Sequence, residues 1–130
     1  MRKILFILLS LSLFTSSCKK KVGCTNNRAT NYNYEAQKDD GSCQFSNVTF
    51  YITSPPNYPP VTIYINGSAI GTFTAYFPNG PGNCSATGCV SYTLTSSSSV
   101  DWEARDAVNN VVSGSVQANS TMDCIKVRVY

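Results

Sequence analysis

The chain predicts an all-β protein: a seven-stranded β-sandwich of Ig-like or transthyretin-like outline, preceded by a small disulfide-closed loop module. The first observation behind this prediction is a series of short segments from Phe45 onward in which apolar and polar residues alternate with a period of two. The second is that turn-forming Gly, Pro and Asn separate these segments at short intervals. The third is that no stretch has a helical period long enough to compete.

The expected strands are the segments 48–52, 61–65, 72–77, 90–94, 100–104, 111–116 and 125–129. The proline-rich segment 55–60 and the serine run 96–99 are expected to be loops. Asn66-Gly67 predicts a hairpin with a type I′ turn, which needs positive φ at two successive residues, and Asn109-Asn110 is a weaker form of this signal. A domain of this size buries only about 60% of its unfolded surface, so disulfides are expected to stabilise it.

The first 18 residues predict where the protein resides. Arg2 and Lys3 precede an apolar run over residues 4–14, and small hydroxylic residues then lead to Cys18. This order is typical of a secretory signal peptide, and the run is shorter than the about 20 apolar residues of a membrane-spanning helix. A cysteine directly after Thr-Ser-Ser resembles the lipobox of bacterial lipoproteins. The resemblance implies removal of residues 1–17 and a lipid on Cys18, whereas the alternative is an ordinary signal peptide beside a chance cysteine.

Residues 18–22 would then form a lipidated tether. Its lysines, Lys19, Lys20 and Lys21, are expected to be solvated and to be attracted to anionic headgroups by on the order of 1 kcal/mol each. Lysine directly after the lipidated cysteine implies, by the sorting preference of such lipoproteins, delivery to the outer membrane. The protein would face either the periplasm or the cell surface there.

Charge and composition exclude several classes of function. The chain has ten Lys and Arg against seven Asp and Glu, but two of the cations lie in the leader and three in the tether. No basic face therefore remains for a phosphate backbone, which argues against nucleic acid as a partner. Histidine is absent, which excludes Ser-His-Asp and Cys-His catalysis and imidazole zinc sites.

Acidic side chains leave one class of catalysis open. Asp101 and Glu103 would lie on one face of a strand about 7 Å apart, near the separation of paired glycosidase carboxylates, and Asp106 follows them. Removal of residues 1–17 from the 130-residue chain leaves 113 residues, too few for a second domain that would form a cleft. The protein is therefore expected not to be an enzyme.

Residues 23–44 are expected to form the module, and residues 45–130 the sandwich. The segment 23–43 has few apolar groups and no hydrophobic period, so it cannot fold by burial alone. A Cys24–Cys43 bridge would close a loop of about 20 residues and stabilise it by roughly 3 kcal/mol. The segment resembles a short module of secreted and surface proteins of Bacteroidetes, with Gly-Cys-Thr, Asn-Tyr and Asp-Asp-Gly-Ser-Cys in the family's positions.

The module departs from that family at three positions: Asn26, Asn27 and Tyr34 replace an aspartate and two prolines. Its oxygen-rich side chains are nevertheless candidate ligands for a structural calcium ion, which takes six to eight oxygens. The candidates are Asn26, Asn31, Asn33, Asp39 and Asp40. The alternative is that Asp-Asp-Gly-Ser is only a turn and that the asparagines cap the main chain locally.

The sandwich carries three further cysteines. Cys84 and Cys89 are expected to form a small disulfide that stiffens a loop, since their spacing is wider than that of a redox pair. Cys124 in the last strand could capture either of them instead. With Cys18 lipidated, the five remaining cysteines are an odd number, so one is free or paired outside the chain. The region around Cys84, Cys89 and Trp102 is also similar, more loosely, to small uncharacterised lipoprotein domains of Bacteroidetes.

Exposed aromatic side chains are the remaining lead to a ligand, because β-sandwich modules bind sugars with aromatic faces flanked by Asn and Asp. The candidates are Tyr58, Tyr64, Tyr76 and Phe77. Tyrosine also simply favours strands, and Trp102 is in phase with the core positions of its segment. The sequence predicts an outer-membrane lipoprotein with a non-enzymatic structural or interaction role and an envelope protein or glycan as partner. A glycan-binding accessory lipoprotein is the alternative.

Overall fold

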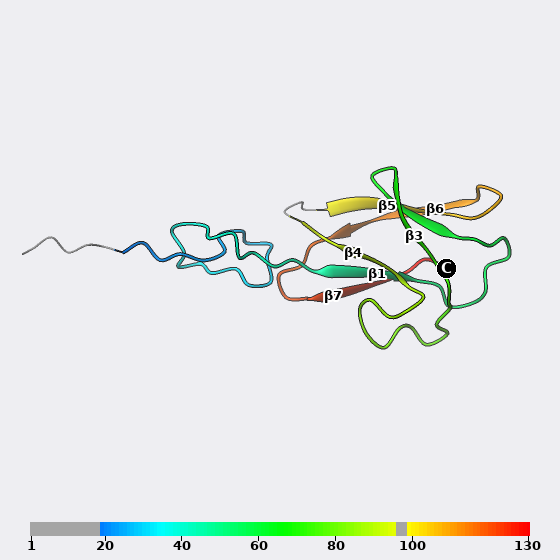
Figure 1. The fold of residues 1–130 in the computed structure, drawn as a ribbon, viewed down its shortest axis with the longest axis horizontal. Helices are drawn as coiled ribbons and strands as arrows, with labels where there is room; N and C mark the ends of the chain where they lie inside the picture. The colour runs from blue at the N-terminus through cyan, green and yellow to red at the C-terminus, as the bar shows by residue number, and fades with distance from the viewer. Residues whose placement is uncertain (1–18, 96–98) are drawn as a thin grey trace, which may run out of the picture.

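The computed structural model describes residues 19–95 and 99–130, so the leader and Cys18 lie outside the described residues. These residues form two β-sheets packed face to face (Figure 1), with no helix among them that could cross a membrane. The seven strands are β1 (Asn47–Tyr51), β2 (Thr62–Ile65), β3 (Ser68–Thr72), β4 (Val90–Thr93), β5 (Ser99–Arg105), β6 (Val111–Gln117) and β7 (Cys124–Arg128). The predicted all-β sandwich of seven strands is therefore confirmed.

The smaller sheet has the order β4-β1-β7, and the larger sheet has the order β3-β2-β5-β6. β1 pairs with β7 in parallel, from Asn47 opposite Cys124 to Tyr51 opposite Arg128. The other strand pairs in the described part of the chain are antiparallel. Because β1 leads away from the module and β7 runs beside it in the same direction, the chain reaches Tyr130 at the end of the sandwich farthest from the module (Figure 1).

The core lies between the sheets and takes aliphatic side chains from both. Phe50 of the smaller sheet packs against Trp102 of the larger sheet, with ring centroids 5.4 Å apart and planes tilted by 58°. Trp102 is 6% exposed, as the alternation of its strand predicts. A Cβ atom at Gly114, its neighbour on β6, would lie 2.9 Å from the indole, so this glycine allows the ring to approach the strand closely.

The third strand lies earlier in the chain than the alternation predicts. Asn66 and Gly67 have φ of 48° and 81° and form the predicted two-residue hairpin turn. Ser68 directly follows this turn, so the return strand begins there and ends at Thr72. Residues 73–77, where the alternating pattern predicts most of the strand, instead belong to a loop in which Phe73 and Phe77 are half-buried and residues 74–76 are exposed.

A long loop between β3 and β4 covers the outer face of the smaller sheet. Thr49, at the centre of β1, is fully buried, although it points away from the core. Its hydroxyl oxygen accepts a hydrogen bond of 3.0 Å from the main-chain N–H of Ser85 in this loop. The Lys126 ammonium on β7 donates to the Pro81 carbonyl oxygen at 2.8 Å. Both faces of β1 are therefore buried.

The module has no regular strands and is held by turns and one disulfide. Cys24 is joined to Cys43, with Cα atoms 4.8 Å apart, as predicted. Cys24 and Ala29 are its buried residues. The N–H of Thr30 donates to the Gln44 carbonyl oxygen at 2.8 Å, and the next residue, Phe45, already packs against the sandwich core. The module therefore ends where the core of the sandwich begins.

Candidate binding site

A pocket lies at the end of the sandwich farthest from the module, where the β1–β2 loop, the β5–β6 loop and the end of the chain meet (Figure 1). We call it the distal pocket. It is lined by Pro56, Asn57 and Tyr58 from the first loop, Asp106 and Asn110 from the second, Val112 from β6, and Tyr130. Its volume is about 350 Å³, at the lower end of the range for small-molecule sites.

Asp106 organises the β5–β6 loop. Its Oδ1 atom accepts hydrogen bonds from the main-chain N–H groups of Val108 at 3.0 Å and Asn110 at 2.8 Å, and its Oδ2 atom accepts one from the Asn110 Nδ2 group at 2.7 Å. Asn109 has φ of 63°, which closes a five-residue turn in place of the tight hairpin that Asn109-Asn110 suggested. Asp106 and Asn110 are thereby held side by side at the pocket.

The electrostatics of Asp106 follow from these hydrogen bonds. Desolvation acts to raise the pKa of Asp106, but the hydrogen bonds from Asn110 and Val108 outweigh it and hold that pKa below its ordinary value. Burial, and secondarily the negative charge of Asp106, raises the pKa of the Tyr130 phenol. At neutral pH the pocket therefore presents one carboxylate beside a neutral phenol.

Hydrogen bonds hold the main chain that carries the two aromatic side chains of the pocket. The Tyr58 carbonyl oxygen accepts a hydrogen bond of 3.0 Å from the N–H of Ala107, which ties the β1–β2 loop to the β5–β6 loop. The carbonyl oxygen of Tyr130 accepts hydrogen bonds of 3.2 Å from the N–H and the hydroxyl of Thr53. Tyr58 and Tyr130 nevertheless leave 52% and 38% of their surface exposed. Two partly exposed phenols thus lie on a preformed scaffold.

Of the four aromatic candidates, the structure brings Tyr58 alone to this pocket. Tyr64 lies on the outer face of β2, where the Arg105 guanidinium covers its ring at 4.7 Å from the centroid. Tyr76 lines a separate apolar hollow with the prolines of the β1–β2 loop, and Phe77 is half-buried beside β1. The four side chains therefore do not form one surface.

Sequence reasoning missed Asn110 and Tyr130 as pocket residues. The spacing of Asp106 and Asn110 around Asn109 was a usable signal, because an Asp four residues before an Asn can close a loop between two strands. Tyr130 had no such signal, since its position depends on the parallel pairing of β1 and β7. The sequence indicates Asp106 only as a candidate catalytic acid.

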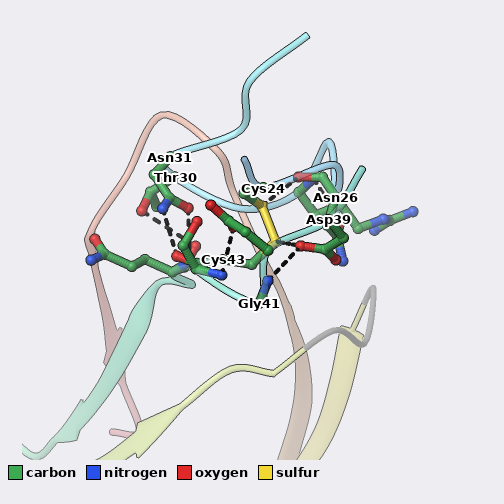
Figure 2. The surroundings of a disulfide bond; sticks show 11 residues. Cys24, Asn26, Thr30, Asn31, Asp39, Gly41 and Cys43 are labelled. Carbon is green, nitrogen blue, oxygen red and sulfur yellow. Dashed lines mark hydrogen bonds between the residues drawn. A yellow bond between two sulfur atoms is a disulfide. The ribbon is translucent and has the colours of Figure 1, made fainter. Parts of the chain in front are cut away.

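Three of the candidate calcium ligands, Asn26, Asn31 and Asp39, lie around the Cys24–Cys43 disulfide (Figure 2). Asn26, Asn33, Asp39 and Asp40 each use a side-chain oxygen to accept a hydrogen bond of 3.0 Å from the main-chain N–H two residues further on. Asn31 instead links to the end of the module, donating to the Ser42 carbonyl oxygen and accepting from the N–H of Gln44. These oxygens make the local caps expected of the turn alternative.

Among the residues that the structure describes, the acidic side chains of the module do not converge with other acidic groups or thiols on a common point. In the described part of the chain, no three Asp, Glu or Cys residues are grouped so that they could hold a metal. Hydrogen bonds from the hydroxyl and the main chain of Ser42 hold the pKa of Asp40 below its ordinary value. Asp40 is therefore an ionised capping residue, and calcium binding by the module stays a prediction.

The disulfide of the sandwich differs from the expected one. Cys84 is joined to Cys124, with Cα atoms 5.7 Å apart, and the Cys84–Cys89 bridge is not formed. The reason is the path of the β3–β4 loop, which crosses the smaller sheet and brings the Cys84 sulfur within 3.5 Å of the Asn47 carbonyl oxygen, opposite Cys124. Cys89 is a free thiol at the start of β4, and burial raises its pKa.

The two carboxylates on β5, Asp101 and Glu103, have different surroundings. Glu103 accepts hydrogen bonds from the Arg105 guanidinium, whose positive charge balances the carboxylate, whereas Asp101 is exposed.

Comparison of the chain with protein-family models, with curated proteins and with solved structures finds no match. The distal pocket is therefore the basis on which a function can be inferred.

Proposed function

We propose that this protein is a lipoprotein that is anchored to the outer membrane through Cys18 and acts by binding, not by catalysis. The observation that carries the proposal is that the loops lining the distal pocket lie at the opposite end of the sandwich from the module (Figure 1). A lipid on Cys18 would hold the module beside the membrane. The pocket would then face away from the membrane, where a soluble or surface-bound partner can reach it.

The tether supports this orientation. Lys21 forms an ion pair with Glu35 of the module, so it is already partnered. Lys19 and Lys20 are exposed, and each could gain on the order of 1 kcal/mol near anionic headgroups. A single acyl chain anchors a protein only marginally, so the lipid on Cys18 and these two cations would act together.

The electrostatics of the acidic residues support a binding role. Asp106 is the only charged side chain that lines the distal pocket, and its pKa lies below the ordinary value, so it cannot act as a general acid near neutral pH. Glycoside hydrolysis needs two carboxyl groups that flank one bond. The second carboxylate nearest in sequence, Glu103, is bound to Arg105.

Membrane fractionation tests the proposal. Cys18→Ser should shift the protein from the membrane pellet to the soluble fraction and abolish labelling with a radioactive fatty acid. Cys89→Ser is the matched control, because it removes the free thiol of the folded domain and should leave the protein in the pellet. Persistence of Cys18→Ser in the pellet, with the sandwich folded by circular dichroism, would refute lipid anchoring.

A further inference from the structure

We propose that the distal pocket binds a neutral saccharide, with Tyr58 and Tyr130 contacting the sugar ring and Asp106 and Asn110 binding its hydroxyl groups. The inference rests on the proposed binding role and names the ligand of that same site. The site is a pocket built from three separate parts of the chain, and not the surface of four aromatic residues that the sequence suggests.

The first argument is the pair of phenols. Tyr58 and Tyr130 are large residues that lie outside the hydrophobic core. Both remain about half exposed, although hydrogen bonds hold the main chain at each of them. An aromatic ring offers a flat apolar face and, in tyrosine, a polar hydroxyl at its edge. A pyranose has the complementary surface, with C–H groups on its faces and hydroxyls around its rim. Val112 adds apolar surface to the lining of the pocket.

The second argument is the unused hydrogen-bonding capacity of Asp106 and Asn110. Asp106 Oδ1 already accepts two hydrogen bonds, but Oδ2 accepts one and keeps a free lone pair. The Asn110 amide donates one N–H to Asp106 and keeps a second N–H and its carbonyl oxygen. An acceptor therefore lies directly beside a donor. Adjacent hydroxyl groups of a sugar match this arrangement, because one hydroxyl can donate to Asp106 while its neighbour accepts from Asn110.

The third argument is charge. Asp106 is the single charged side chain of the pocket lining, and its pKa is low, so it stays ionised at neutral pH. A fixed negative charge disfavours phosphate, sulfate and carboxylate ligands. A carboxylate that accepts from a hydroxyl makes a hydrogen bond stronger than a neutral pair would. Neutral sugars are thus favoured over acidic ones.

The fourth argument is that the pocket exists before the ligand arrives. The Ala107 to Tyr58 and Thr53 to Tyr130 hydrogen bonds fix the main chain beneath both rings. Binding therefore costs little ordering of loops. Because the pocket is open and small, we expect affinities for single sugars in the range of roughly 10 μM to 1 mM, as is usual where a few hydrogen bonds and one stacking contact act alone.

The test is an array of neutral, amino and acidic oligosaccharides probed with the full-length protein in detergent micelles, followed by titration of the best neutral oligosaccharide by NMR. Wild-type protein should bind neutral oligosaccharides more strongly than acidic ones. Tyr58→Ala and Asn110→Ala should each weaken the titrated binding by several-fold, up to about tenfold, the loss expected for one contact of this kind. Asn110→Ala is informative because its main-chain N–H can still cap Asp106.

Tyr76→Ala is the matched control, since Tyr76 is 50% exposed but does not line the distal pocket, with which its own hollow shares only Pro56. It should change the affinity less than about twofold. Sugar binding that survives both pocket variants, an array without any neutral signal, or preference for a basic peptide over every sugar would overturn the inference. None of these results affects the release of Cys18→Ser from membranes, so failure of the saccharide inference and failure of the anchoring proposal are told apart.

Discussion

Removal of the Cys84–Cys124 disulfide is the sharpest test of the fold. This bridge spans 40 residues, whereas the Cys24–Cys43 bridge spans 19. In the chain-entropy model, a loop of the first length stabilises the folded state by about 4 kcal/mol and one of the second length by about 3 kcal/mol. A domain of this size has a total stability of about 5–15 kcal/mol, so loss of the longer bridge is expected to remove a large share of it.

The longer bridge also holds the loop that covers the outer face of the smaller sheet. Without it, the hydrogen bond from Ser85 to Thr49 would no longer be constrained, and Thr49 would become accessible to water. We therefore expect Cys84→Ser/Cys124→Ser to lose at least the entropic contribution of about 4 kcal/mol. The unfolded chain should also be more expanded, so the dependence of the unfolding free energy on denaturant should become steeper.

Urea unfolding followed by tryptophan fluorescence measures this loss, because Trp102 is buried in the core and is the single tryptophan of the chain. All variants are best made in the Cys89→Ser background, which prevents thiol exchange and should itself change the stability by less than about 0.5 kcal/mol. A loss below about 1 kcal/mol for the double variant would contradict the loop-closure reasoning. A Cys84–Cys89 peptide in a non-reducing digest of the wild-type protein would show that the assigned pairing is wrong.

Three further predictions concern the core, the module and the distal pocket. Gly114→Val should destabilise the protein by about 1–3 kcal/mol in urea melts, because its side chain would meet the indole of Trp102; an unchanged midpoint would mean that β6 moves freely. If the module holds calcium, calcium at a 100-fold excess over Kd should add about 2.7 kcal/mol to the free energy of unfolding. A chelator, or the double substitution Asp39→Ala/Asp40→Ala, should remove this gain. If calcium does not change the melting curve, capping of the main chain is the role of these residues. Asp106 has a pKa below its ordinary 3.8, so its contribution to stability is fully present above that value and is lost as pH falls through the folded pKa. Urea melts of Asp106→Asn and wild type should therefore differ at neutral pH and converge in acid. A difference that persists in acid would refute this linkage.

Local features of the chain were readable from the sequence because their physical causes are local. Six of the seven strands lie where apolar residues alternate with a period of two, since that period alone decides which residues share a face. Asn66-Gly67 forms the predicted turn because these residue types tolerate positive φ. Cys24 and Cys43 pair in a segment that has too few apolar groups to fold by burial, so a disulfide within the segment is needed to hold it in one conformation.

Tertiary structure alone decided which distant segments meet. The alternation over 72–77 misplaced the third strand, because Phe73, which continues that alternation, packs against the core from the loop that follows β3. Cys84 finds Cys124 instead of Cys89, since the β3–β4 loop crosses the smaller sheet, and that path depends on which strands are neighbours. Likewise, the distal pocket combines Tyr58 with Tyr130 because β1 and β7 run in parallel. Strand order and direction are set by the packing of the whole chain, and a period of two carries no information about either.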